Sequence, residues 1–184
     1  LLEAIAGIRT PISGEIFLNG KAVDQANPAR LRKMGLAHIP EDRHHMGLVL
    51  KFEEYENSVL GYHRAAAYSK GPLLNFEAIR KDAMEKIETY DIRPPNPRLQ
   101  TAGFSGGNQQ KIVVAREIGR DPKMLIIGQP TRGVDIGAIE FIHRRIVEMR
   151  VGMLSDVLID PNQAFAVRRR LARVFSTAVS QRAA

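Results

Sequence analysis

A short, wholly apolar run between polar segments constrains the fold of this chain most. The run Met124-Leu125-Ile126-Ile127 has the length and composition of a strand buried on both faces, and the polar turn Gly128-Gln129-Pro130-Thr131 follows it. Asp135 can then cap a helix with an apolar face of Ile139, Ile142, Ile146 and Met149. Strands of this kind are typical of parallel sheets covered by helices, which predicts an α/β fold.

The other segments alternate between strand and helix patterns around an insertion with helical patterns only. We expect strands over residues 14–18 and 36–39, a turn at Asn19-Gly20, and a polar loop over 41–50. We expect helices at residues 1–7, 28–34, 53–67, after a cap at Asn75, and from Ser105-Gly106-Gly107 to about Ile118. Residues 93–97 hold three prolines and cannot continue a helix. The pattern predicts an α/β core in residues 1–150 with a helical subdomain at about 50–118.

Composition excludes several classes of protein. The 184 residues are 44% hydrophobic and 26% charged, as in globular domains, and no apolar run approaches the roughly 20 residues of a membrane span. The absence of cysteine excludes disulfides and thiolate metal sites. The net charge of +7 suits nucleic acid or an anionic membrane, but we favour a solvated surface with a basic tail.

Two stretches carry candidate chemistry. Ser105, Gly106 and Gly107 stand where a helix begins, so unpaired backbone N–H groups, the positive end of the helix dipole and a hydroxyl can together bind a phosphate. Gly128 and Gln129 stand at the carboxyl end of the buried strand, where ligands bind in open α/β sheets. From the residues alone, a plain helix cap and a plain strand-to-helix turn remain open as alternatives.

Taken in order, these stretches resemble the nucleotide-binding domain of ABC transporters over about residues 1–150. The run from Ser105 to Gln110 looks like the signature motif, Gln129-Pro130-Thr131 like the end of Walker B, and Gly133-Val134-Asp135 like the D-loop. Pro40-Glu41-Asp42-Arg43 resembles the segment at the Q-loop. The residues of these motifs are most similar to those of the second ATPase domain of tandem ATP-binding subunits of importers for nucleosides or simple sugars.

The resemblance implies an ABC-type P-loop NTPase-like core, ATP and Mg²⁺ as cofactors, and ATP hydrolysis that drives transport. It implies that Ser105, Gly106 and Gly107 contact the γ-phosphate of ATP held by a second ABC domain, while Asn108 and Gln109 hold the loop. Gly133, Val134 and Asp135 would lie at the seam between the domains. Glu41, Asp42 and Arg43 would couple to transmembrane permease subunits, which place the chain peripherally at the cytoplasmic face of the plasma membrane. A substrate-binding protein would be an indirect partner, and nucleic acid no partner.

Three departures from the family pattern matter. The glycine-rich P-loop is absent, so we expect the chain to begin just after it, within the helix that follows. Gly128-Gln129 replaces the usual Asp-Glu, which removes the Mg²⁺ ligand and the water-activating carboxylate, so we expect no catalytic residue here and no activity of the chain alone. After Arg150 we find neither the usual strand with its switch segment nor the closing stretch.

Residues 151–184 are therefore an atypical basic tail, with five Arg against two Asp. A strand over residues 151–159 and a basic helix over 166–179 are conceivable in it. Truncation, fusion and a shifted reading frame remain open as its origin.

The histidines and the overall function each allow another interpretation. His38, His44 and His45 lie near Glu41 and Asp42, but adjacent histidines seldom face one ion, so we predict a solvated coupling loop and no metal site. A non-catalytic interaction module from a decayed ABC gene is one alternative function. A soluble ABC protein acting on nucleic acid or ribosomes is another.

Overall fold

The computed structural model describes residues 2–10, 16–18, 21–23, 27–152 and 156–159. The turn expected at 19–20 and the basic helix expected at 166–179 lie outside these residues. The helices are α1 (Leu2–Ile5), α2 (Pro28–Lys33), α3 (Glu54–Ser58), α4 (Phe76–Thr89), α5 (Gly106–Ile118) and α6 (Ile136–Gly152). The strands are β1 (Phe17–Leu18), β2 (Lys21–Ala22), β3 (Leu36–Ile39), β4 (Ser69–Lys70), β5 (Leu73–Leu74), β6 (Met124–Ile127) and β7 (Asp156–Ile159). A π-helical turn spans Arg43–Gly47 and a 3-10 turn spans Thr101–Gly103.

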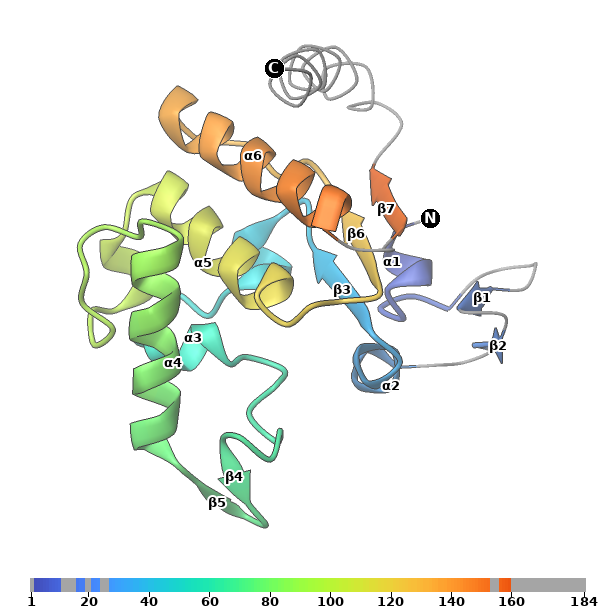
Figure 1. The fold of residues 1–184 in the computed structure, drawn as a ribbon, viewed down its shortest axis with the longest axis horizontal. Helices are drawn as coiled ribbons and strands as arrows, with labels where there is room; N and C mark the ends of the chain where they lie inside the picture. Colours follow the sequence, from blue (N-terminus) through green and yellow to red (C-terminus); the bar gives the residue numbers. More distant parts are fainter. Residues whose placement is uncertain (1, 11–15, 19–20, 24–26, 153–155, 160–184) are drawn as a thin grey trace, which may run out of the picture.

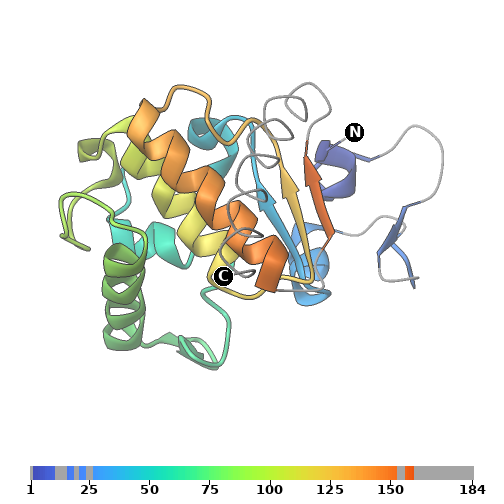
Figure 2. The ribbon, with the colours of Figure 1, turned by 45° about the horizontal axis from the view of Figure 1, so that its top comes forward.

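A parallel sheet in the order β3-β6-β7 forms the centre of the fold (Figures 1 and 2). Ile127 of β6 pairs with Ile39 on one side and with Ile159 on the other, so the apolar run predicted as a buried strand is the middle one. Part of residues 151–159, which the sequence allowed as a strand, forms β7 and extends the sheet. The strand conceived at 151–159 was too long, since α6 continues to Gly152 before β7 begins at Asp156.

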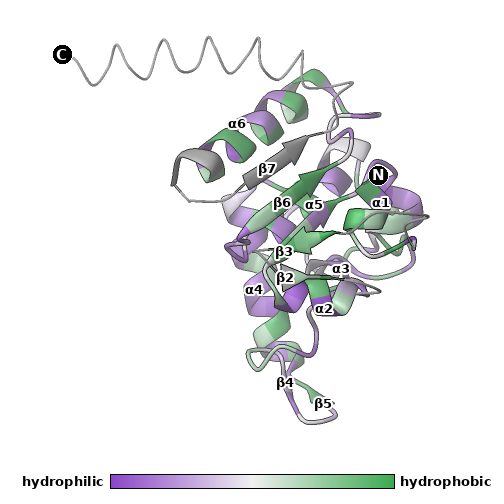
Figure 3. Ribbon diagram, turned by 90° about the vertical axis from the view of Figure 1, so that its right-hand side faces the viewer, coloured by the Kyte–Doolittle hydropathy of each residue, from purple (hydrophilic) through white to green (hydrophobic). Residues whose placement is uncertain are grey.

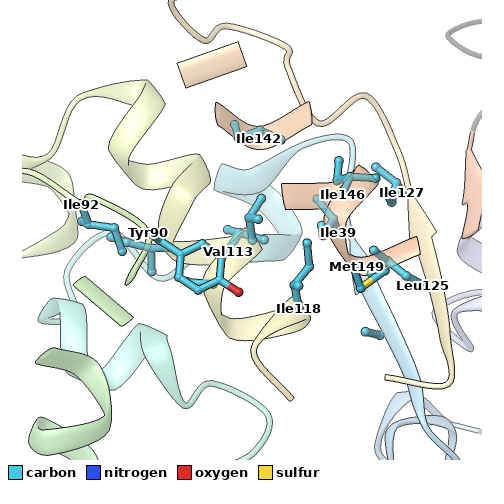
Figure 4. Close-up of a cluster of buried hydrophobic side chains, with 14 of the residues drawn as sticks. Ile39, Tyr90, Ile92, Val113, Ile118, Leu125, Ile127, Ile142, Ile146 and Met149 are labelled. Atoms are coloured by element: carbon cyan, nitrogen blue, oxygen red, sulfur yellow. The ribbon is translucent and has the colours of Figure 1, made fainter. Parts of the chain in front are cut away.

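Alternating side chains of β3 and β6 enter two separate cores. Ala37, Ile39, Leu125 and Ile127 face α5 and α6, as the close-up in Figure 4 shows for Ile39, Leu125 and Ile127. Leu36 and Ile126 point to the opposite face, where they join the side chains Leu18, Val23 and Leu31. Strand β6 is hydrophobic along its length in Figure 3. Burial on both faces is what a parallel sheet requires, and it explains why β6 carries no polar side chain.

The segment between β3 and α5 forms a subdomain of α3, α4 and the antiparallel hairpin β4–β5, with the hairpin at the end farthest from the sheet (Figure 1). It has a small core of its own made of Val59, Tyr68 and Ile79. Helix α5 packs against α3 and α4 on one side and against β3 and α6 on the other. The subdomain boundaries at about 50 and 118 stay a prediction.

Helix starts follow the predicted caps. The side chains of Asn27, Asn75 and Ser105 each accept a hydrogen bond from the backbone N–H three residues later, and so does Asp135 at α6. The helix predicted over 53–67 is wrong: α3 ends at Ser58 and turns follow. Among these turns, Gly61 has a φ of 82°, which is outside the helical region. A Cβ on Gly61 would lie only 2.8 Å from the guanidinium carbon of Arg32.

A buried polar network lies below the loop after β3. Arg116 and Glu117 of α5 form an ion pair at 2.8 Å, and Tyr62 donates to Glu117 at 2.7 Å. Burial, reinforced by the Glu117 carboxylate, raises the pKa of the Tyr62 hydroxyl. Arg116 also donates to the carbonyl of Gly47 at 2.8 Å, which fastens the end of the π-helical turn to α5.

In the described part of the chain, no helix is long and apolar enough to cross a bilayer.

Candidate functional site

The start of α5 presents a capped and exposed polar loop. Ser105 is exposed, and its Oγ accepts hydrogen bonds from the Asn108 backbone N–H at 3.4 Å and from the Asn108 side-chain amide at 2.9 Å. The Asn108 carbonyl oxygen in turn accepts from the backbone N–H of Arg93 at 2.8 Å. Asn108 therefore links Ser105 to the proline-rich loop.

Gly106 and Gly107 are needed for packing as well as for access to the backbone. A Cβ on Gly106 would lie 2.8 Å from the carbonyl oxygen of Gly133 and 2.8 Å from Nη2 of Arg43. A Cβ on Gly107 would lie 2.5 Å from Oδ2 of Asp135 and 2.9 Å from Cβ of Ala138. These distances are far below ordinary contact, so the two glycines let α5 begin against the start of α6.

Gln109 is buried behind this loop and makes four hydrogen bonds. Its amide nitrogen donates to the carbonyls of Thr101 and Phe104, both at 3.1 Å. Its carbonyl oxygen accepts from Nε2 of His44 at 2.7 Å and from Nε of Arg43 at 3.5 Å. The last two bonds join the signature loop to the segment after β3. The sequence had predicted that this segment couples to permease subunits.

The segment after β3 is organised by Asp42 and Arg43. Asp42 accepts hydrogen bonds from the backbone N–H groups of His44 and His45 at 2.9 and 3.1 Å. These bonds lower the pKa of the Asp42 carboxyl, and the bond from His45 has the larger effect. Arg43 donates to the carbonyls of Arg132 and Gly133 at 2.8 and 3.3 Å.

The predicted D-loop residues lie on the other side of the same cluster. Asp135 caps α6 through a 2.9 Å hydrogen bond from the backbone N–H of Ala138, and Val134 packs against the main core. The predicted groups 41–43, 105–109 and 133–135 are thus brought together at one edge of the molecule.

The end of β6 offers no carboxylate. Gly128 is buried, and a Cβ there would lie 3.0 Å from the backbone nitrogen and 3.3 Å from Cβ of Glu41. Gln129 adopts a φ of 38°, in the left-handed region. Glu41, whose backbone lies beside Gly128, has its carboxylate 3.3 Å from the guanidinium of Arg132. These residues do not fit a Mg²⁺ ion, which prefers carboxylate oxygens.

A polar cavity of about 440 Å³ lies beside the start of α5. Its charged side chains are Asp91, Arg93, Lys111, Asp135, Glu140 and Arg144. Lys111 donates to the carbonyl of Asp91 at 2.6 Å, and its ammonium lies 4.8 Å from the centre of the Phe141 ring. Sequence reasoning missed most of this set, because the residues come from α4, α5 and α6 neighbourhoods that only tertiary packing joins.

Comparison with known proteins identifies the domain. The sequence profile of the family described as "ABC transporter" matches residues 1–132. The chain belongs to the ABC transporter family. Solved ATP-binding cassettes share this ABC fold: a dimeric cassette in a post-hydrolysis state with ADP and phosphate superposes with a TM-score of 0.67 at 20% identity, covering 87% of this chain and 68% of that one. A nucleotide-free cassette gives 0.66 at 16% identity, covering 91% and 67%.

The curated relatives of this ABC domain are importer subunits. A guanosine import ATP-binding protein of Bacillus subtilis is 44% identical over 150 residues, covering 82% of this chain and 29% of its own length. A nucleoside import ATP-binding protein of Lactococcus lactis is 41% identical over 82% of this chain and 30% of its own length. A glucose import ATP-binding protein of Haloferax volcanii is 37% identical, over 86% and 29%. The chain thus spans less than a third of these relatives.

Proposed function

We propose that this ABC domain is part of the ATP-binding subunit of an importer for nucleosides or simple sugars. In it, Ser105, Gly106 and Gly107 complete an ATP site whose P-loop belongs to a second ABC domain. The observation that carries the proposal is the capped N-terminus of α5, where Ser105 is exposed and Gly106 is partly exposed. The relatives are ATP-binding proteins of guanosine, nucleoside and glucose import, which supports the substrate class.

The carboxylates that bind Mg²⁺ and activate water for ATP hydrolysis would come from the partner domain. Gly128 has no side chain to bind Mg²⁺, and Gln129 can orient a water but is a poor base. The P-loop domain would hold ATP and Mg²⁺, and this chain would supply hydrogen-bond donors to the γ-phosphate. We therefore expect no ATP hydrolysis by this chain alone.

The partners follow from the same proposal. The segment Glu41–Arg43 would contact transmembrane permease subunits, and a substrate-binding protein would act upstream of them. The subunit would sit peripherally at the cytoplasmic face of the plasma membrane.

Substitution of Ser105 tests the proposal. In the intact ATP-binding protein carrying this sequence, assembled with its permease, Ser105→Arg should lower ATP turnover by about 100-fold or more, because it removes a donor and places a bulky cation at the γ-phosphate site. ATP affinity of the P-loop domain should change little, since the P-loop holds most of the nucleotide. Gln129→Ala should lower turnover less than Ser105→Arg. Turnover by Ser105→Arg equal to that of the wild type would refute the proposal.

A further inference from the structure

The signature loop is attached to a distant segment through one side chain, that of Gln109. Both of its amide hydrogens are used within its own loop, on the carbonyls of Thr101 and Phe104. This fixes the orientation of the amide, so its oxygen must face His44 and Arg43. Because an amide oxygen only accepts, Nε2 of His44 must carry the proton in the 2.7 Å hydrogen bond.

Arg43 extends this attachment to the D-loop. Its Nε donates to Gln109, while Nη1 and Nη2 donate to the carbonyls of Arg132 and Gly133. Nη2 also occupies the space behind Gly106, where a Cβ would lie 2.8 Å from it. One planar guanidinium therefore contacts both loops that the proposed function places at the seam between the two ABC domains.

The connection is long-range and separable from the local fold. His44 and Arg43 are 65 and 66 residues from Gln109, and within the described ranges they make the long-range hydrogen bonds of its side chain. Without them Gln109 still holds its own loop through Thr101 and Phe104. Loss of His44 should thus weaken the attachment of the signature loop to the segment after β3, which Arg43 still contacts, and leave the loop folded.

We propose that His44 and Arg43 are positioning residues that hold the signature loop and the D-loop in register with the segment after β3. A movement of that segment would then be passed to Ser105 through Gln109. The inference rests on the proposed function, which gives the signature loop its role in ATP turnover, and goes beyond it by naming the side chains that set the loop's position.

The chain offers matched variants for a test. His44→Leu removes the donor, whereas His44→Gln keeps an N–H donor at nearly the position of Nε2. His45→Leu is the control, because His45 is an exposed neighbour whose backbone N–H, a group that the substitution keeps, donates to Asp42. All three are measured for ATP turnover in the intact ATP-binding protein assembled with its permease, beside Ser105→Arg.

The expected pattern separates kcat from KM. His44→Leu should lower kcat about tenfold and change KM for ATP by less than about twofold, because the nucleotide is held by the P-loop domain and only its closure onto the signature loop is impaired. His44→Gln should restore kcat to within about twofold of the wild type, and His45→Leu should match the wild type. The midpoint of thermal unfolding should fall by no more than about 2 °C in each case, as for surface substitutions.

Each other outcome is decisive. If Ser105→Arg abolishes turnover while His44→Leu behaves as the wild type, the positioning role is refuted and the proposed function stands. If neither substitution affects turnover, both are refuted. If His44→Gln is as impaired as His44→Leu, or if the loss follows a fall in unfolding temperature, His44 has a purely structural role and the inference is refuted.

Discussion

Individual side chains in this domain carry two kinds of constraint, steric and electrostatic. The steric kind is at Gly106 and Gly107, where no Cβ fits. The electrostatic kind is at Glu54, the first residue of α3, which is fully buried and whose Oε1 accepts from Ser58 at 2.5 Å, while Oε2 lacks a hydrogen-bond partner within the described residues. Burial raises the pKa of Glu54 to about 7, against the opposing effects of Ser58 and Lys86.

Glu54 should make stability depend on pH. Its folded-state pKa lies above the unfolded value of 4.5, so the folded state binds the proton more tightly. The contribution is fully present below pH 4.5 and is lost as pH rises to about 7, by on the order of 3 kcal/mol. Glu54→Gln should flatten this part of the curve of unfolding free energy against pH, measured by denaturant titration. Parallel curves for the two proteins over this window would contradict the assigned pKa.

At the scale of elements, the fold depends on how closely α5 and α6 begin. The two helices run side by side (Figure 2), and their first turns meet where Gly107 faces Asp135 and Ala138. This contact also sets the spacing between the signature loop and the D-loop. A change of one methyl group at this point should therefore affect stability and the geometry of the site together.

Gly107→Ala should destabilise the domain by about 1–3 kcal/mol, because its Cβ meets the rigid Cβ of Ala138 at 2.9 Å. Gly137→Ala is the matched control in the first turn of α6, where the new Cβ would have an ordinary 3.5 Å contact with Asp135. It should be neutral or stabilising by up to about 1 kcal/mol, since alanine favours the helix. Chemical denaturation of both variants measures the difference. If the two substitutions changed the free energy of unfolding equally, the contact between α5 and α6 at Gly107 would not be sterically tight.

For the whole molecule, α5 is the element that joins the sheet to the helical subdomain. Its residues from Gln109 to Ile118 are all buried, whereas Leu73 and Leu74 of the distal hairpin β4–β5 are exposed. Arg116, which is paired with Glu117 within α5, donates a buried hydrogen bond to the carbonyl of Gly47 in the segment after β3. Stability should therefore be concentrated in α5 and β6 and be lowest at the hairpin.

Hydrogen exchange should follow this gradient. Amides of α5 and β6 should exchange only on global unfolding, because every route to solvent requires separation of the two cores. Amides of residues 69–74 should exchange faster by at least about 100-fold, because β4 and β5 are joined by only two residue pairs and their leucines are exposed. Exchange monitored by mass spectrometry on the full chain measures both. Protection of the hairpin equal to that of α5 would mean that the two parts unfold as one unit.

The local sequence determined the elements whose cause is local. The apolar run of β6 required burial on both faces, and the caps Asn27, Asn75, Ser105 and Asp135 begin their helices because each side chain reaches a backbone N–H three residues on. The signature and D-loop motifs could be placed at helix starts for the same reason. The motifs also sufficed for the family, because two of them stand in the family's order.

Only the tertiary structure decided the rest. The guanidinium of Arg32 packs against Gly61 in the turns after α3, and Arg43 and His44 reach Gln109 across more than 60 residues of chain. Neither contact has a periodic pattern or a local propensity that a sequence can display. A hydrogen bond between distant residues exists only when packing brings the donor to the acceptor, so it is a property of the folded chain and not of either segment.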